Sequence, residues 1–172
     1  LQPAVLRVGE HEVQTLAEVV TAGYGDMVGT VVTTGRALLE ADAAPGAPPV
    51  AVISDAAWRD LFGRQTTALG ATIRLNGTAF TIVGVSPQTG SNAFFGAGVD
   101  AWVSTAYADA LLSRGWRTDR RDRFWNMLVR FDEASTPELR TRAAQATADL
   151  AAAWPDPWRD RRVGFETKSV AC

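Results

Sequence analysis

The sequence predicts an α+β fold, in which mixed β-sheets are combined with short helices. Two patterns lead to this prediction: a β-hairpin centred on Asn76-Gly77 and a strand–helix–strand succession over residues 124–170. The composition agrees, since the 172 residues are 47% hydrophobic and 21% charged, as in an ordinary folded globular chain. A chain of this length fits one domain or two small subdomains, and either can bury a core.

The N-terminal region predicts one or two strands, over residues 4–8 and 12–20. Residues 23–29 follow and contain three glycines, which are expected at a corner between a strand and a helix. Their spacing, G-x-G-x-x-x-G, is one residue longer than the dinucleotide-binding fingerprint, and no second mononucleotide-binding half follows. We therefore interpret these glycines as structural.

A strand and a short helix are predicted next, after a loop over residues 41–49 that is dense in Ala, Pro and Gly. Residues 49–53 are predicted to form the strand. Ser54 provides an oxygen suited to capping the N-terminus of a helix over residues 55–62. Gly63 is placed to end that helix.

The hairpin is the strongest local signal. Residues 71–75 and 78–85 alternate apolar and polar side chains and flank Asn76-Gly77, the dipeptide that best tolerates a type I′ turn. One face of the hairpin is therefore expected to be packed. Residues 86–99 are predicted to be a loop that carries Phe94-Phe95.

The C-terminal third predicts a β-α-β unit. Residues 124–131 are expected to form a strand, and residues 163–170 a returning strand. Between them a helix runs to about Trp154, and Pro155 ends it. Its start is signalled either by a capping box of Ser135 and Glu138 or by Thr136 as N-cap with Pro137 at the first helical position. Both starts fit the sequence.

Charge and cysteine content exclude several classes of function. The 17 basic and 19 acidic residues give a net charge of −2, which argues against a general polyanion binder. No apolar run reaches the length of a membrane span. The only cysteine, Cys172, allows neither an intramolecular disulfide nor a cysteine-based metal site.

Few residues are candidates for catalysis. His11, the only histidine, lies between Glu10 and Glu12 and is interpreted as a surface residue. Asp100 and Trp102 suggest a sugar-binding pair, although a polar strand start followed by a core tryptophan is the favoured interpretation. No catalytic, cofactor-binding or metal-binding residue is predicted.

A basic cluster is the remaining feature. It comprises Arg114, Arg117, Arg120, Arg121 and Arg123, interrupted by Asp119 and Asp122 and flanked by Trp116 and Trp125. Arginines with aromatic neighbours bind nucleic-acid strands in some proteins. In a chain that is acidic overall, we expect instead a solvated loop, or a docking surface for an anionic partner or a lipid headgroup.

Several segments, taken in order, resemble the extracytoplasmic core domain of MacB-like ABC transporter permeases. The central ones are PVAVISDAAWRDLFG (residues 49–63), LGATIRLNGTAFTIVGVSP (residues 69–87) and DAWV (residues 100–103). On either side, VTAGYGDMVG (residues 20–29) with Gly35-Arg36, and LVRF (residues 128–131) with the helix after it, are also similar to the family. Gly25, Ser104 and the missing segment expected before Leu1 depart from its pattern.

The resemblance implies a domain inserted between the first and second membrane helices of a permease. A β-rich inserted subdomain is expected at about residues 20–110, and a porter-like β-α-β subdomain at about residues 1–19 with 120–172. Such a domain is non-enzymatic and needs no cofactor. It couples ATP-driven helix motion to export or release of substrate on the extracytoplasmic face of the bacterial membrane.

The implied partners are the membrane helices, a separate ATPase, a periplasmic adaptor and a second copy of the domain, but not nucleic acid. The predicted contact residues are Phe94, Phe95, Arg114, Arg117, Arg120 and Arg121. Because the chain starts without Met, we expect it to be cut from a longer protein. Two alternatives stay open: a secreted ligand- or glycan-binding module that uses Trp102, Trp116 and the Phe94-Phe95 loop, and an enzyme that uses His11 with a carboxylate.

Overall fold

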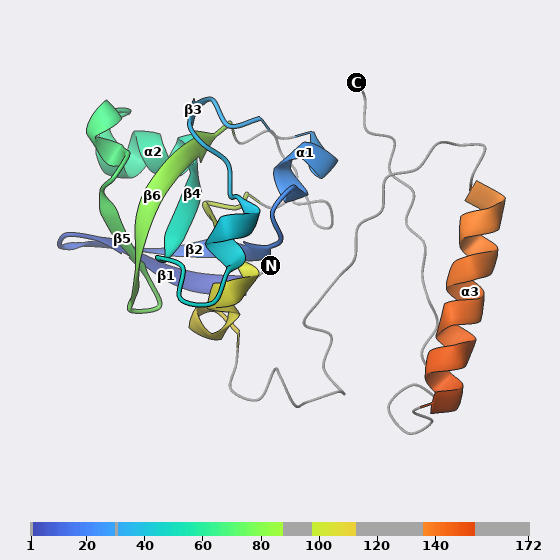
Figure 1. Cartoon of the computed structure of the whole chain (residues 1–172). Helices are drawn as coiled ribbons and strands as arrows, with labels where there is room; N and C mark the ends of the chain where they lie inside the picture. The colour runs from blue at the N-terminus through green and yellow to red at the C-terminus, as the bar shows by residue number, and fades with distance from the viewer. Residues whose placement is uncertain (1, 30, 88–97, 113–135, 154–172) are drawn as a thin grey trace. The chain divides into compact units, whose positions relative to one another are not determined.

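The computed structural model describes residues 2–29, 31–87, 98–112 and 136–153 (Figure 1). The chain divides into two compact units, residues 1–114 and residues 115–172, which are described separately. The second unit contributes one described element, the helix α3 (Thr136–Ala153). The first unit contains the strands β1 (Gln2–Val8), β2 (His11–Val20), β3 (Thr34–Gly35), β4 (Val50–Ser54), β5 (Thr72–Leu75), β6 (Thr78–Ser86) and β7 (Ala101–Ser104), the helices α1 (Tyr24–Val28) and α2 (Asp55–Phe62), and the 3-10 turns η1 (Glu40–Ala43), η2 (Thr66–Ala68) and η3 (Thr105–Ala110).

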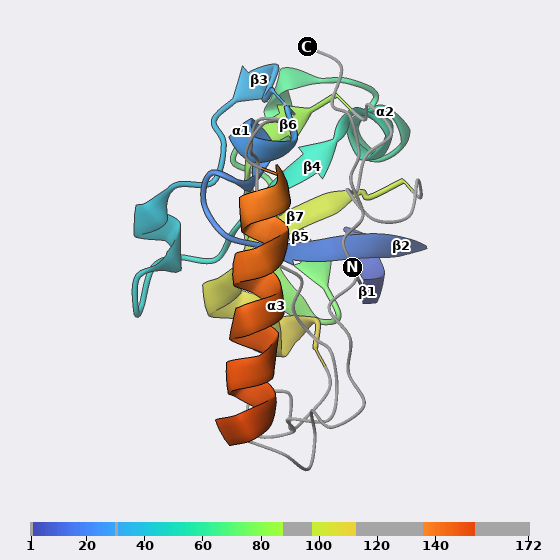
Figure 2. The same ribbon diagram turned by 90° about the vertical axis from the view of Figure 1, so that its right-hand side faces the viewer.

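The sheet of the first unit closes on itself. Its order is β3-β6-β4-β7-β2-β1-β5, and β5 pairs with β6 as well as with β1. All strands except β3 therefore form a ring, and β3 pairs with β6 where β5 has ended. The β2–β7 and β4–β6 pairs are parallel, and the other pairs are antiparallel. Figure 2 shows β2, β7 and β4 side by side in this ring.

The interior of the closed sheet is the main hydrophobic core. Side chains alternate between the two faces of each strand, so Ala51 and Ile53 of β4 point inward while Val50 and Val52 point outward. The buried strand residues of the interior are Ala4, Leu6, Ala17, Ala51, Ile53, Ile73, Leu75, Phe80, Ile82, Val85, Ala101 and Val103. Closure leaves the ring strands paired along both edges, which stiffens the sheet and removes aggregation-prone edges.

Helix α2 packs against this core and has the predicted bounds. The Ser54 hydroxyl accepts a hydrogen bond from the backbone N–H of Ala57 at 2.9 Å, so Ser54 is the N-cap. Gly63 ends the helix in the left-handed conformation, with φ 56°. Trp58, Leu61 and Phe62 of the helix pack on the core. The predicted strand–helix unit is thus confirmed.

The predicted hairpin is also confirmed. Asn76 and Gly77 both have positive φ, 48° and 85°, as a type I′ turn requires. The Asn76 side chain accepts a hydrogen bond from the N–H of Val5 at 2.9 Å, which fastens the turn to β1. The turn residue therefore also sets where the hairpin joins the ring.

A second hydrophobic cluster covers the outer face of β2, β4 and β7. Its buried members are Val20, Leu38, Val50, Val52, Val99 and Trp102. Strands β4 and β7 are consequently buried on both faces, which explains why they are apolar at consecutive positions. The segment that leads into and out of β3 lies over this face (Figure 1).

The predictions for the C-terminal part are tested in one element. Helix α3 ends at Ala153 within the described residues, close to the predicted end. The predicted strands at residues 124–131 and 163–170 lie outside the described residues. In the first unit β1 and β2 are members of the closed sheet, and the grouping of residues 1–19 with 120–172 in a second subdomain stays a prediction.

Candidate functional site: a pocket outside the closed sheet

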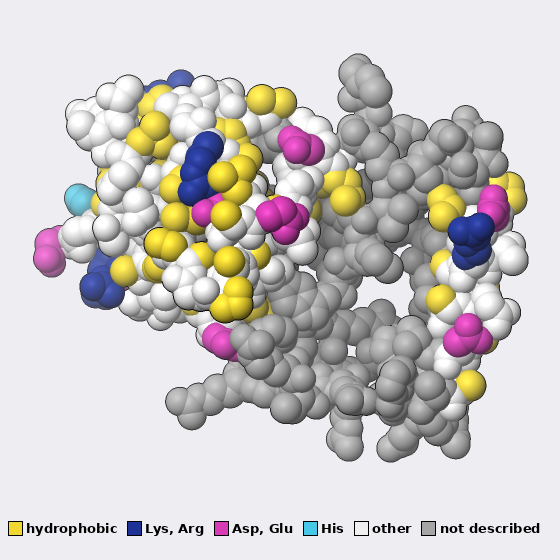
Figure 3. Space-filling view, viewed as in Figure 1, with side chains coloured by type: hydrophobic (Ala, Val, Ile, Leu, Met, Phe, Trp, Pro, Cys, Tyr) yellow, Lys and Arg dark blue, Asp and Glu magenta, His cyan; other side chains and the backbone are white. Residues whose placement is uncertain are grey.

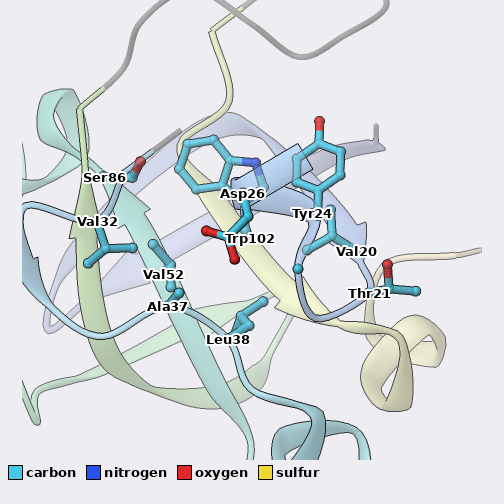
Figure 4. A pocket seen from close by; sticks show the side chains of 12 residues that line it. Val20, Thr21, Tyr24, Asp26, Val32, Ala37, Leu38, Val52, Ser86 and Trp102 are labelled. Atoms are coloured by element: carbon cyan, nitrogen blue, oxygen red, sulfur yellow. The ribbon is translucent and has the colours of Figure 1, made fainter. Parts of the chain in front are cut away.

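A pocket of about 70 Å³ opens on the outer face of the closed sheet, between the sheet and α1 (Figure 4). Its floor comes from strand residues that also belong to the second hydrophobic cluster. Its other sides come from α1 and from the segment around β3. The lining residues that matter below are Val20, Val32, Leu38, Val52, Ser86, Trp102 and Asp26.

Two glycines shape the α1 side of the pocket. Gly23 and Gly29 flank the five-residue helix with φ values of 79° and 74°, a conformation in which residues with a Cβ are strained. The chain can therefore turn sharply before and after α1. This turn brings Tyr24 and Asp26 to the pocket. Gly23 and Gly29 therefore have the structural role that the sequence predicts.

The opposite side is positioned by an ion pair. Arg36 and Asp42 form two hydrogen bonds, of 2.7 Å between Nη1 and Oδ2 and 3.0 Å between Nη2 and Oδ1. Asp42 Oδ2 also accepts the backbone N–H of Leu39 at 2.8 Å. The Arg36 hydrogen bond lowers the pKa of Asp42 and raises that of Arg36, although burial opposes both shifts. The pair holds the segment that carries Leu38.

A close approach of backbones fixes the same segment to β6. Gly35 and Gly84 are partners in the β3–β6 pair. A Cβ built on Gly84 would lie 2.2 Å from the carbonyl oxygen of Arg36, and one built on Gly35 would lie 2.3 Å from that of Val83. Only glycine allows this contact, so the family-like Gly35-Arg36 motif serves to place the pocket wall.

Trp102 forms the aromatic part of the pocket. It is only 9% exposed, and its indole N–H donates to Glu18 Oε2 at 3.2 Å. Glu18 is itself buried and is the register partner of Trp102 in the β2–β7 pair. A buried carboxylate therefore lies directly behind the aromatic wall.

Two further polar groups face the pocket. The Ser86 hydroxyl belongs to a residue that is 2% exposed, and among the described residues it has no hydrogen-bond partner. Asp26 is exposed, and within the described parts of the chain its carboxylate forms no ion pair. An unsatisfied buried hydroxyl is uncommon in folded proteins and calls for a partner.

The surface around the pocket is apolar. Val31 is 70% exposed and Leu39 is 50% exposed, both within a few residues of pocket-lining side chains. Figure 3 shows hydrophobic side chains gathered on this face of the first unit. Exposed apolar surface around a concave site is typical of protein contacts.

Asp100 has a structural role. Thr15 Oγ1 donates to Asp100 Oδ2, and Ser54 Oγ donates to Asp100 Oδ1 at 3.0 Å. The backbone N–H of Ser54 donates to the Asp100 carbonyl at 3.0 Å. Asp100 thus ties β2 and β4 to the start of β7. Together with the burial of Trp102, this agrees with a strand start and a core tryptophan rather than a sugar-binding pair.

His11 lies at the exposed start of β2, beside the ion pair of Arg7 and Glu12. Within residues 2–29, 31–87, 98–112 and 136–153, no group of three or more His, Cys, Asp or Glu side chains is arranged to hold a metal ion. The predicted contact residues Phe94, Phe95, Arg114, Arg117, Arg120 and Arg121 all lie outside the described residues, as does Trp116.

Sequence reasoning did not identify the pocket. The sequence predicts a strand for the residues around Val52 and a core position for Trp102, and Asp26 lies in the segment interpreted as a structural glycine corner. The apolar runs of β4 and β7 were the available signal, since a strand that is apolar on both sides needs a second cover. Nothing in those runs shows that the cover leaves a hollow.

The sequence matches a protein-family profile over most of its length. The family is described as the MacB-like periplasmic core domain, and the match spans residues 2–146. The chain belongs to this family. The resemblance seen in the ordered segments is therefore confirmed, and so is the α+β class of the MacB-like fold.

Two solved structures are similar to this MacB-like chain. The periplasmic region of MacB from Actinobacillus actinomycetemcomitans is 21% identical, with a TM-score of 0.46 over 58% of this chain and 51% of that one. The extracellular domain of the noncanonic ABC-type transporter YknZ from Gram-positive bacteria is 21% identical, with a TM-score of 0.49 over 60% and 50% of the two chains. The present chain spans about half the length of each. Comparison with curated proteins gave no match.

Membership in the MacB-like family makes this chain an extracytoplasmic domain, as predicted. Among the described residues, none of the helices combines the length and the apolar character that a membrane crossing requires.

Proposed function

We propose that this domain is the extracytoplasmic part of an ABC transporter permease and that it transmits the motion of membrane helices to substrate outside the membrane. The family match over residues 2–146 is the observation that carries the proposal. ATP hydrolysis is assigned to a separate cytoplasmic ATPase, and the domain itself is proposed to be non-catalytic.

The closed sheet suits a transmitting role. Force is passed on without loss only through a body that does not deform, and close-packed interiors have low compressibility. Strand β1 pairs with β2 over its whole length and with β5 through Leu6 and Arg7. A membrane helix linked upstream of β1 would therefore transmit its motion to the ring through β1 and its continuous pairing with β2.

Partner contacts complete the proposal. A periplasmic adaptor and a second copy of the domain are proposed as partners, alongside the membrane helices and the ATPase. Phe94, Phe95, Arg114, Arg117, Arg120 and Arg121 are proposed to make contacts with them. Aromatic and arginine side chains are enriched where proteins meet, which supports this choice.

The parent reading frame provides the first test. We expect apolar helices of about 20 residues, one before this segment and further ones after it. A parent protein without such helices would contradict the proposal.

Coupling is tested in the parent permease with a flexible insertion. About six Gly/Ser residues placed directly before β1 form a slack linker, and we expect ATP hydrolysis to persist while transport is lost. The same insertion in the exposed β1–β2 turn at Gly9-Glu10 is the matched control, and it should leave transport largely intact. Equal transport by both variants would count against mechanical coupling.

A secreted ligand- or glycan-binding module is less well supported. Trp102 is only 9% exposed and its indole N–H is bonded to Glu18, so it offers too little open surface for a sugar ring to stack on. The pocket of about 70 Å³ is also far smaller than the several hundred Å³ of a typical small-molecule site. Calorimetric titration of the chain with a panel of small molecules and glycans tests this alternative, which requires at least one ligand that binds.

A further inference from the structure

We propose that the pocket between α1 and the closed sheet receives a lysine side chain from a partner polypeptide. The inference rests on the proposed function, because it gives one of the partner contacts a chemistry and a place. Its test uses the isolated chain and small probes, so its failure leaves the test of the parent reading frame unaffected.

The size of the pocket favours one side chain. A volume of about 70 Å³ accommodates about five to seven non-hydrogen atoms, when each occupies about 10–15 Å³ of such space. The lysine side chain has a four-carbon stem that ends in a compact ammonium group. Larger groups, such as an indole or a nucleotide base, exceed this space.

The walls suit a long aliphatic stem. Val20, Leu38 and Val52 are buried and apolar, and Val32 packs with them. Figure 4 shows these side chains around the hollow together with Trp102 and Asp26. Lysine commonly buries its methylene groups along such a surface while its ammonium group stays near water or a counter-charge.

The charge around the pocket favours a cation. Asp26 lines it with an exposed carboxylate, and Glu18 lies behind Trp102. Among the described residues that line the pocket, none is basic. The nearby Arg36 is neutralised by its two hydrogen bonds to Asp42.

The Ser86 hydroxyl provides an independent indication of a ligand. It lines the pocket, its residue is 2% exposed, and it lacks a hydrogen-bond partner within the part of the chain that the structure describes. A hydroxyl has two lone pairs that can accept, and an ammonium group has three donors. An ammonium group that donates to Ser86 therefore keeps two donors for the Asp26 carboxylate or for water.

The test is a titration of the ¹⁵N-labelled chain with three blocked amino acids: N-acetyl-lysine methylamide, its Nε-acetylated form, and the norleucine analogue, which has the stem without the charge. The indole N–H signal of Trp102, assigned with Trp102→Phe, reports on the pocket. We expect lysine to bind about threefold more tightly than either uncharged analogue, as a half-exposed ion pair allows. The preference should fall at high salt.

Substitutions test whether the preference for lysine over its uncharged analogues arises in the pocket. Asp26→Asn should make lysine and norleucine bind equally, whereas Glu10→Gln removes the same charge from the exposed β1–β2 turn and should leave the preference unchanged. Ser86→Ala should weaken binding of lysine more than that of norleucine.

Three outcomes would overturn the proposal. They are equal binding of lysine and norleucine to the unmodified chain, an equal effect of Asp26→Asn and Glu10→Gln, and no response of the Trp102 signal to any probe. The last outcome would indicate that the pocket is filled by the chain itself or is closed to polypeptide side chains.

Discussion

Gly35 and Gly84 face each other in the β3–β6 pair, and neither position has room for a side chain. At Gly35 a Cβ would lie 2.3 Å from the Val83 carbonyl oxygen, and the backbone has a φ of 80°. Gly46 has nearly the same φ, 79°, but nothing lies within 4 Å of its Cβ position. Substitutions at Gly35 and Gly46 can therefore be compared to separate the cost of backbone strain from the cost of steric overlap.

We expect Gly35→Ala to lower the free energy of unfolding by about 3 kcal/mol, because it combines the strain of a left-handed residue with a backbone clash. Gly46→Ala should cost about 1 kcal/mol from strain alone. Urea denaturation of both variants measures the difference. Equal losses would show that β3 moves away from β6 at little cost.

The Arg36–Asp42 pair leads to a pH-dependent prediction. Hydrogen bonding to Arg36 lowers the pKa of Asp42 in the folded chain. A depressed carboxyl pKa adds stability above the unfolded pKa of about 4, and this stability is lost as the pH falls through the folded pKa. Asp42→Asn should therefore be less stable than the natural chain at pH 7, by about 1 kcal/mol given the part-exposed arginine.

The difference in free energy of unfolding between Asp42→Asn and the natural chain should shrink as the pH falls below about 4. Urea denaturation at a series of pH values measures it. Asp60→Asn is the control, because the Arg59–Asp60 pair is exposed on both sides and should contribute little at any pH. A difference that stays constant down to low pH would assign the effect of Asp42→Asn to packing instead of charge.

At the scale of the element, Ser54 connects α2 to the sheet. Its hydroxyl accepts from the Ala57 N–H and donates to Asp100, so one buried side chain caps a helix and joins β4 to the start of β7. Ser104 has a simpler position, with one bond of 3.3 Å from the Ala106 N–H at the start of η3. Both are N-caps, but only Ser54 bridges two elements.

Ser54→Ala should therefore destabilise the domain more than Ser104→Ala. We expect a loss of about 2 kcal/mol for Ser54→Ala, from the lost cap and the lost partner of Asp100, and about 0.5 kcal/mol for Ser104→Ala. Thermal unfolding followed by circular dichroism compares the two. A larger loss for Ser104→Ala would mean that the bond to Asp100 contributes nothing.

At the scale of the whole molecule, the ring of strands lies entirely within the first compact unit. The strand that completes it is β7, which pairs with both β2 and β4. Without β7 these two strands lose a shared neighbour, and the outer hydrophobic cluster loses Trp102.

A fragment of residues 1–114 should consequently fold by itself and unfold cooperatively. A fragment of residues 1–99 lacks β7 and should remain largely unfolded, because its interior would be open to water. Near-ultraviolet circular dichroism and urea titration distinguish the two. Failure of residues 1–114 to fold would show that the second unit is needed for stability.

Much of the fold could be predicted because its signals are local. The positive φ of Asn76 and Gly77, the cap at Ser54 and the left-handed Gly63 each depend on a few neighbouring residues. The family could likewise be inferred from short segments in order. The pocket could not, because Asp26, Ser86 and Trp102 come from distant parts of the chain.

The sequence by itself therefore determined the turns, the caps, the alternation of strand faces and the family of this protein. Only the tertiary structure decided that β5 pairs with both β1 and β6, which closes the sheet. It also decided that the segments packed over β4 and β7 leave a hollow beside the exposed carboxylate of Asp26. The physical reason is that a period of two specifies which face of a strand is buried but not which strand lies beside it.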